Sequence, residues 1–308
     1  MILTSVSLRS MPPCRSMLAG DSARASSAIS SHRPQAGSYL SNRRVFLTLA
    51  ALGSLFNAAL TAAEPAPAPL PPIQHPALFL VGDSIMKTGT GDGARGPWGW
   101  GSEIGALFDA AKLHVYNEGR GGRSSRGYRE EGAWAKILEQ IQPGDFVIVQ
   151  FAHNDTANSA NYPDRATINS GGEESVQIGV GDQRKTIRTY GWYLRQYAAD
   201  VKAKGATLVI CSPAPRNQWA EGKIKRGFDS YAQWAADAAR ATGTAFIDLN
   251  ALACDRFDAL GQEKSRAYFN DPQHTTKLGA RLNAECVAAG LRLLAAHPLA
   301  AFLAPGPR

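Results

Sequence analysis

Cysteine is scarce in this chain of 308 residues, which contains four. Cys14 lies in the polar N-terminal region, and the other three are Cys211, Cys254 and Cys286. These last three are an odd number without short spacing, which argues against a disulfide framework and against a zinc site in the rest of the chain. Cys211 ends an apolar run and is typical of a core residue, whereas a bridge between Cys254 and Cys286 stays open. The sequence predicts no metal site.

The apolar segment near the N-terminus is too weakly hydrophobic for a typical membrane anchor. It follows Arg43-Arg44 and ends at Thr61-Ala62-Ala63, a small-residue site suited to signal peptidase. The paired arginines and the modest hydrophobicity of 49–53 are typical of a bacterial twin-arginine export signal. We therefore expect residues 1–63 to direct the protein to the periplasm or the exterior, without stable membrane insertion after cleavage. An uncleaved anchor is the alternative, and Met11 and Met17 are alternative starts.

The chain lacks a strong net charge once this leader is set aside. The leader contains six of the 33 Lys and Arg residues and one of the 26 Asp and Glu residues, which leaves 27 basic and 25 acidic residues. A remaining net charge of +2 gives no reason to expect nucleic acid as a partner. The high isoelectric point of the whole sequence comes from the leader.

Beyond the leader, residues 64–72 form a Pro/Ala tether and residues 73–308 have the length of one α/β domain. Short runs rich in Val, Ile, Leu and Phe alternate with segments of helical period, a pattern typical of strands covered on both faces. The pattern predicts a three-layer α/β/α sandwich with a five-stranded parallel sheet. The predicted strands are 78–81, 113–116, 146–151, 207–211 and 245–249, and the predicted helices are about 100–110, 131–141, 186–204, 229–242 and 277–296.

Two distant segments carry the residue types of a serine hydrolase. Ser84 directly follows the first predicted strand, and Asp271 lies three residues before His274, just ahead of the last predicted helix. A serine hydroxyl becomes a useful nucleophile when an imidazole takes its proton and a carboxylate holds that imidazole. We predict these roles for Ser84, His274 and Asp271, which the sheet would bring together beyond its carboxyl edge.

Four blocks resemble the SGNH (GDSL-type) hydrolases, in particular the rhamnogalacturonan acetylesterases. They are Gly82-Asp83-Ser84, the glycine-rich segment 117–126, His153-Asn154-Asp155 and Asp271-x-x-His274-Thr275. The resemblance runs from about residue 78 to 294, and it implies a flavodoxin-like fold and catalysis without a cofactor. It also implies that the backbone N–H groups of Ser84 and Gly122 and the Asn154 amide form an oxyanion hole. At position 152 the family's glycine is replaced by alanine.

Residues that bind the substrate are harder to identify. Arg120 and Arg123 lie beside the predicted oxyanion turn and are candidates for binding substrate carboxylates, although a solvated or internally paired basic face is equally open. Trp98 and Trp100 are candidates for stacking on sugar rings, and packing of Trp100 in the core is an equally open alternative. The polar insertion 156–184 is long enough to be a functional loop over the site.

The sequence therefore predicts an exported serine esterase that removes acetyl groups from an acetylated plant cell-wall polysaccharide or oligosaccharide, with rhamnogalacturonan as the leading substrate. One alternative keeps the site and changes the substrate to acetyl-xylan, a lipid or a thioester. A second alternative is a non-catalytic carbohydrate-binding protein.

Overall fold

The computed structural model describes residues 75–91, 96–156, 162–179, 184–226, 228–294 and 296–305. The predicted export signal and the tether lie outside these residues, so both stay predictions. Within the described part of the chain, no helix has the length and apolarity needed to cross a membrane.

A parallel sheet of five strands forms the centre of the domain, with the strand order β2-β1-β3-β6-β9. Leu80 of the first strand pairs with Asn117 on one side and with Ile148 on the other, so the strands that carry the predicted site are direct neighbours. The prediction of a five-stranded parallel sheet is confirmed. The strands are β1 (Ala77–Gly82), β2 (His114–Asn117), β3 (Phe146–Gln150), β6 (Thr207–Cys211) and β9 (Ala245–Ile247).

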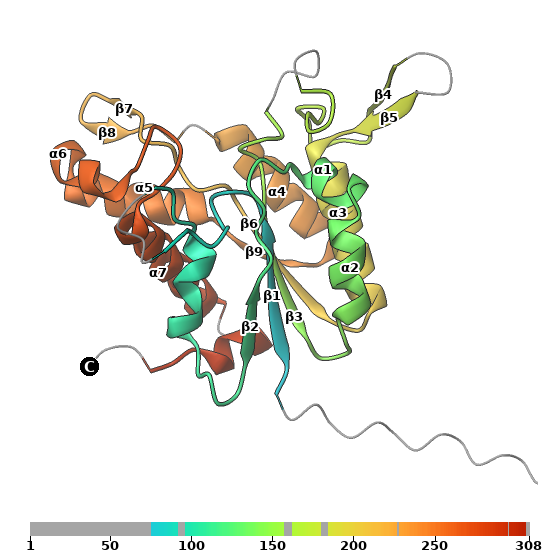
Figure 1. Ribbon diagram of the computed structural model, residues 1–308, viewed down its shortest axis with the longest axis horizontal. Coiled ribbons are helices and arrows are strands. Elements are labelled where there is room, and N and C mark those ends of the chain that lie inside the picture. The colour runs from blue at the N-terminus through green and yellow to red at the C-terminus, as the bar shows by residue number, and fades with distance from the viewer. Residues whose placement is uncertain are drawn as a thin grey trace, which may run out of the picture. The chain divides into compact units, whose positions relative to one another are not determined.

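Helices cover both faces of the sheet, as Figure 1 shows. Alternate residues of a strand point to opposite faces, and the two faces of β1 are both buried. Leu78 and Leu80 pack in one apolar core, while Phe79 and Val81 pack in the other. The first core contains α5 (Leu249–Leu260) and α7 (Lys277–Leu293); the second contains α1 (Ser125–Glu130), α2 (Ala133–Gln140), α3 (Tyr190–Ala203) and α4 (Asp229–Thr242).

The structure differs from the predicted elements where local signals were ambiguous. The helix predicted at 100–110 is two 3-10 turns, η1 (Trp100–Ser102) and η2 (Ile104–Leu107), because glycines weaken an α-helix there. Part of the 156–184 insertion forms β4 (Ser175–Ile178), which pairs with β5 (Lys185–Arg188) and delays the start of α3. The predicted strand 245–249 ends early because the Asp248 side chain accepts the Ala251 N–H at 3.1 Å and caps α5.

The remaining elements are short and lie at the edges of the domain. They are β7 (Trp219–Ala220), β8 (Lys223–Ile224), α6 (Gln262–Ser265), η4 (Arg266–Tyr268) and η5 (Pro298–Phe302). The η4 turn leads directly into the segment that carries Asp271 and His274.

Candidate active site

Three strand ends converge at the carboxyl edge of the sheet. Ser84 follows β1, Gly122 follows β2, and Asn154 follows β3. The Asp83 carbonyl accepts the N–H groups of Met86 at 3.2 Å and Lys87 at 3.1 Å, which turns the chain sharply after β1. This turn presents Ser84 at the strand end, where ligands bind in open α/β sheets.

The predicted triad residues form a continuous hydrogen-bond chain. Ser84 Oγ lies 3.0 Å from His274 Nε2, and His274 Nδ1 lies 2.8 Å from Asp271 Oδ2. Asp271 Oδ1 also accepts the backbone N–H groups of Gln273 and His274, each at 2.8 Å. One carboxylate therefore orients both the imidazole and the turn that carries it. In this geometry the Ser84 hydroxyl can pass its proton to His274.

Two neighbouring segments hold the histidine turn in place. Thr275 bonds twice to Trp98, accepting its N–H at 2.9 Å and donating from Oγ1 to its carbonyl at 2.7 Å. On the other side, Asn217 N–H donates to the Pro272 carbonyl at 2.9 Å. Contacts of this kind limit the movement of His274 relative to Ser84.

The environment of Asp271 favours its ionised form. Burial works to raise the pKa of this carboxyl, but hydrogen bonds from the backbone of His274 and Gln273 and from the His274 ring outweigh it, and the pKa is lowered to about 2. Asp271 is consequently a carboxylate at neutral pH and a hydrogen-bond acceptor for His274 Nδ1–H.

The three residues predicted to supply the oxyanion hole each follow one of three neighbouring strands of the sheet. An ideal Cβ on Gly121 would be 3.9 Å from Ser84 Cβ, so the glycine turn after β2 passes beside the serine. Gly122 has a φ of 76°, which favours glycine. In the described part of the chain, the N–H groups of Ser84 and Gly122 donate to no acceptor. Asn154 Nδ2 donates one hydrogen bond to Arg123 O, at 3.1 Å. Their role as an oxyanion hole stays a prediction.

Ala152 occupies a strained backbone position just before Asn154. Its φ is 138°, in a region that side chains with a Cβ rarely adopt, and the residue is fully buried. The departure from the family's glycine at this position therefore has a structural consequence, which is strain in the segment that presents Asn154.

Buried ionisable groups lie directly beneath the site. Asp83 is fully buried, and this burial, with the nearby Asp155 charge, raises its pKa to about 7. The hydrogen bond that its carboxylate accepts from Ile85 N–H, at 2.9 Å, acts in the opposite direction and lowers the pKa, but it does not outweigh the burial. Burial, together with the charge of Arg216, lowers the pKa of His153 to about 3, and His153 Nε2 donates to Ala214 O at 3.1 Å. His153 is therefore neutral at ordinary pH and serves as a structural residue.

The tryptophans predicted to stack on sugars are core residues, and that prediction is corrected. Trp100 is fully buried and donates from Nε1 to Gln150 Oε1 at 3.0 Å. Trp98 is 7% exposed and donates to Glu103 Oε1 at 2.8 Å. Neither offers a ring face to a ligand, because each is enclosed by the segments around η1.

The predicted substrate arginines are paired within the protein. Arg120 Nη1 lies 3.7 Å and Arg123 Nε lies 2.8 Å from the Glu131 carboxylate. This is the internally paired alternative, although both side chains remain roughly half exposed (44% and 46%). Arg165 also lies near the oxyanion turn, where an ideal Cβ on Gly122 would be 3.9 Å from its Nη1. The only sequence signal for Arg165 is its position in the polar insertion.

Other features of the described residues lie outside this site. Cys211, Cys254 and Cys286 are buried and form no disulfide with one another in the described part of the chain, so the bridge between Cys254 and Cys286 that the sequence left open is not formed. Across the described ranges, no group of three or more His, Cys, Asp or Glu side chains is placed to hold a metal ion. A cavity of about 630 Å³ lies at the other end of the sheet, beside the first residues of β6 and β9, and contains none of the predicted site residues.

Comparison with known proteins identifies the family of the chain. The family model for the GDSL-like lipase/acylhydrolase family matches residues 80–282. A rhamnogalacturonan acetylesterase of Emericella nidulans is 30% identical over 217 residues, which cover 70% of this chain and 84% of the relative. A Bacillus subtilis protein, YesY, named as a probable rhamnogalacturonan acetylesterase, is 33% identical over 223 residues. This match covers 70% of this chain and 93% of the relative.

Solved structures share the fold. The crystal structure of Bacillus subtilis YxiM matches with a TM-score of 0.60 and 25% identity, over 73% of this chain and 58% of that one. An acetylxylan esterase of Geobacillus stearothermophilus matches with a TM-score of 0.50 and 17% identity, over 70% of this chain and 94% of that one. From its sequence blocks, its fold and these relatives, the chain belongs to the GDSL-like lipase/acylhydrolase family and is a carboxylic ester hydrolase.

Proposed function

We propose that this protein is an exported serine esterase that removes O-acetyl groups from plant cell-wall polysaccharide, with rhamnogalacturonan as the preferred polymer. The observation that carries the proposal is the hydrogen-bond chain from Ser84 through His274 to Asp271 at the carboxyl edge of the sheet. The choice of polymer is supported by the two relatives named for rhamnogalacturonan.

In the proposed mechanism, His274 Nε2 takes the Ser84 proton while Oγ attacks the acetyl carbonyl. The oxyanion of the tetrahedral intermediate accepts hydrogen bonds from the N–H groups of Ser84 and Gly122 and from the Asn154 amide. Collapse breaks the bond to the sugar oxygen, which takes the proton from His274, and leaves acetyl-Ser84. Asp271 stabilises the imidazolium throughout.

Deacylation repeats these roles with water. His274 removes a proton from a water molecule, whose oxygen attacks the acetyl carbon. The second tetrahedral intermediate collapses, acetate leaves, and the proton returns from His274 to Ser84 Oγ. Each residue ends in its starting state, so the cycle requires no cofactor.

The direct test is acetate release from acetylated rhamnogalacturonan and from acetylated xylan, measured side by side with Ser84→Ala as the blank. Faster release from the pectic polymer supports the proposal. Release from xylan alone would show that acetylated xylan, rather than rhamnogalacturonan, is the substrate. In a separate series of p-nitrophenyl esters, faster hydrolysis of long acyl chains would indicate a lipid substrate.

Export is a further part of the proposal and depends on Arg43-Arg44 and on the small-residue site at 61–63. N-terminal sequencing of the protein recovered outside the cytoplasm is expected to begin at Glu64. Recovery of the intact leader on membranes would favour the uncleaved anchor.

A further inference from the structure

A small pocket opens beside the oxyanion turn. Its volume is about 290 Å³, and its lining includes Gly122, Arg123, Arg165 and Lys185 together with Glu130 and Glu131. Because Gly122 belongs both to this pocket and to the predicted oxyanion hole, a substrate bound at Ser84 would extend into the pocket. The pocket is near the lower end of the volumes of ligand sites, roughly 300 Å³.

Arg165 has a more distant acidic partner than Arg123, its arginine neighbour in this pocket. Its ion pair is with the adjacent Asp164, at 3.9 Å, whereas Arg123 lies 2.8 Å from Glu131. Within the described ranges, Arg165 Nε is buried without a hydrogen-bond partner. A guanidinium of this kind retains the capacity to bind a carboxylate through two parallel N–H bonds.

The two glutamates of the pocket have cationic partners nearer than Arg165, whereas Asp164 pairs with Arg165 itself at 3.9 Å. Glu131 pairs with Arg120 and Arg123, at 3.7 Å and 2.8 Å. Glu130 pairs with Arg126 at 3.8 Å and with Lys185 at 3.9 Å. An incoming carboxylate would therefore meet the Arg165 guanidinium without displacing a close ion pair.

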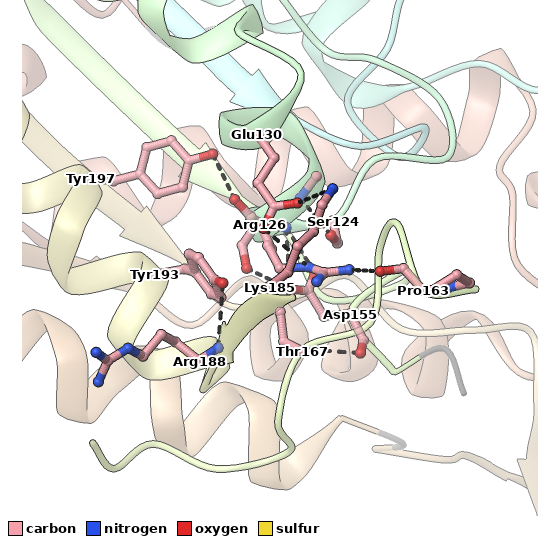
Figure 2. Close-up of polar contacts among 12 residues, drawn as sticks. Ser124, Arg126, Glu130, Asp155, Pro163, Thr167, Lys185, Arg188, Tyr193 and Tyr197 are labelled. Atoms are coloured by element: carbon pink, nitrogen blue, oxygen red, sulfur yellow. Dashed lines mark hydrogen bonds and ion pairs between the residues drawn. The ribbon is translucent and has the colours of Figure 1, made fainter. Parts of the chain in front are cut away.

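The loop that carries Arg165 is fastened to α1. Figure 2 shows the guanidinium of the fully buried Arg126 donating to the Pro163 carbonyl, and the Thr167 hydroxyl directed at Asp155. Thr167 N–H also donates to Asp155 O at 3.2 Å. A Cβ on Gly127 would lie 3.1 Å from Asp164 O, so the loop lies tightly against the helix. This attachment positions Arg165 before substrate arrives, which lowers the entropic cost of binding.

Tyr162 adds an aromatic surface next to Arg165. The Arg165 guanidinium carbon lies 4.9 Å from the centre of the Tyr162 ring, and Tyr162 is 48% exposed. A planar cation beside an exposed aromatic ring suits a sugar that carries a carboxylate, since the ring contacts the apolar sugar face and the guanidinium binds the charge.

We propose that Arg165 determines specificity by binding the carboxylate of a uronic acid residue close to the acetylated sugar. The inference rests on the proposed function and identifies the substrate chemistry that this site selects, an acidic polysaccharide rather than a neutral one.

The test compares wild type with Arg165→Gln on an acetylated rhamnogalacturonan oligosaccharide and on the same oligosaccharide with its uronates reduced to neutral sugars. We expect Arg165→Gln to raise KM for the acidic form about 10- to 100-fold, the effect of losing a charged hydrogen bond. KM for the reduced form and turnover of p-nitrophenyl acetate should stay within about twofold of wild type. The matched control is Arg240→Gln, on an exposed arginine at the far end of α4.

Inhibition by oligogalacturonate gives a second measurement that does not depend on the natural substrate. Oligogalacturonate should inhibit p-nitrophenyl acetate hydrolysis by wild type, and Arg165→Gln should weaken this inhibition by a similar factor. If wild type deacetylates the polymer and Arg165→Gln matches it in every assay, the inference is overturned and the proposed function stands. If wild type releases no acetate from the polymer, the proposed function fails. If, in addition, oligogalacturonate inhibits wild type and Arg165→Gln equally, or inhibits neither, the inference is overturned too.

Discussion

Asp83→Asn should change how the stability of the protein responds to pH. Asp83 is fully buried beneath Ser84, and its pKa is raised from 3.8 to about 7. Because the folded protein binds this proton more tightly than the unfolded chain, the free energy of unfolding falls as pH rises from about 4 to about 7. Asparagine keeps the oxygen that accepts the Ile85 N–H and removes the ionisation.

The magnitude follows from the pKa and the pH window. Two pH units separate pH 5 from a pKa of about 7, and each unit corresponds to 1.36 kcal/mol, which gives about 3 kcal/mol. The free energy of unfolding of Asp83→Asn, relative to that of wild type, should therefore be about 3 kcal/mol higher at about pH 8 than at about pH 5. Comparing the two proteins at both pH values cancels most contributions from other groups.

Urea unfolding followed by tryptophan fluorescence measures this difference. Asp83→Ala is the control variant: it should share the pH response, yet be less stable than Asp83→Asn at both pH values by about 1–3 kcal/mol, because Ile85 N–H loses its acceptor. If the free energies of unfolding of wild type and Asp83→Asn differ by the same amount at both pH values, the reasoning is refuted.

Three further substitutions test neighbouring parts of the site. Asn154→Ala should lower kcat on p-nitrophenyl acetate by about 10²–10³-fold with little change in KM, and an unchanged kcat would remove Asn154 from the oxyanion hole. Trp100→Phe should cost about 1–3 kcal/mol in urea unfolding, since Gln150 Oε1 loses its donor, while KM on polymer stays the same; a raised KM would restore a sugar-binding role. Ala152→Gly should raise the unfolding free energy by about 1 kcal/mol through relief of strain, and a loss of stability would argue against that strain.

The sheet and the triad could be predicted from sequence because their signals are local. Each strand of the sheet is a short apolar run, Ser84 follows the first of these runs, and the Asp271–His274 pair directly precedes the last helical segment. Parallel strands place their carboxyl ends on one edge, so the topology gathers Ser84, Gly122 and Asn154 there.

The roles of the arginines and tryptophans could not be predicted because they depend on tertiary contacts. Arg123 reaches Glu131 across the length of α1, and nothing in their spacing alone requires it. Trp100 is buried because η1 packs against α7, a contact between segments that are far apart in the sequence. Arg165 reaches Gly122 only because its loop folds back onto α1.

The central claim is that Ser84 is the nucleophile of an ester hydrolase, and one kinetic comparison tests it most directly. The measurement is kcat/KM on p-nitrophenyl acetate for wild type and for Ser84→Ala, with circular dichroism to establish that both proteins are folded. The account predicts a loss of about 10³-fold or more, the usual effect of removing a triad nucleophile. Hydrolysis at a rate close to wild type by folded Ser84→Ala would contradict it.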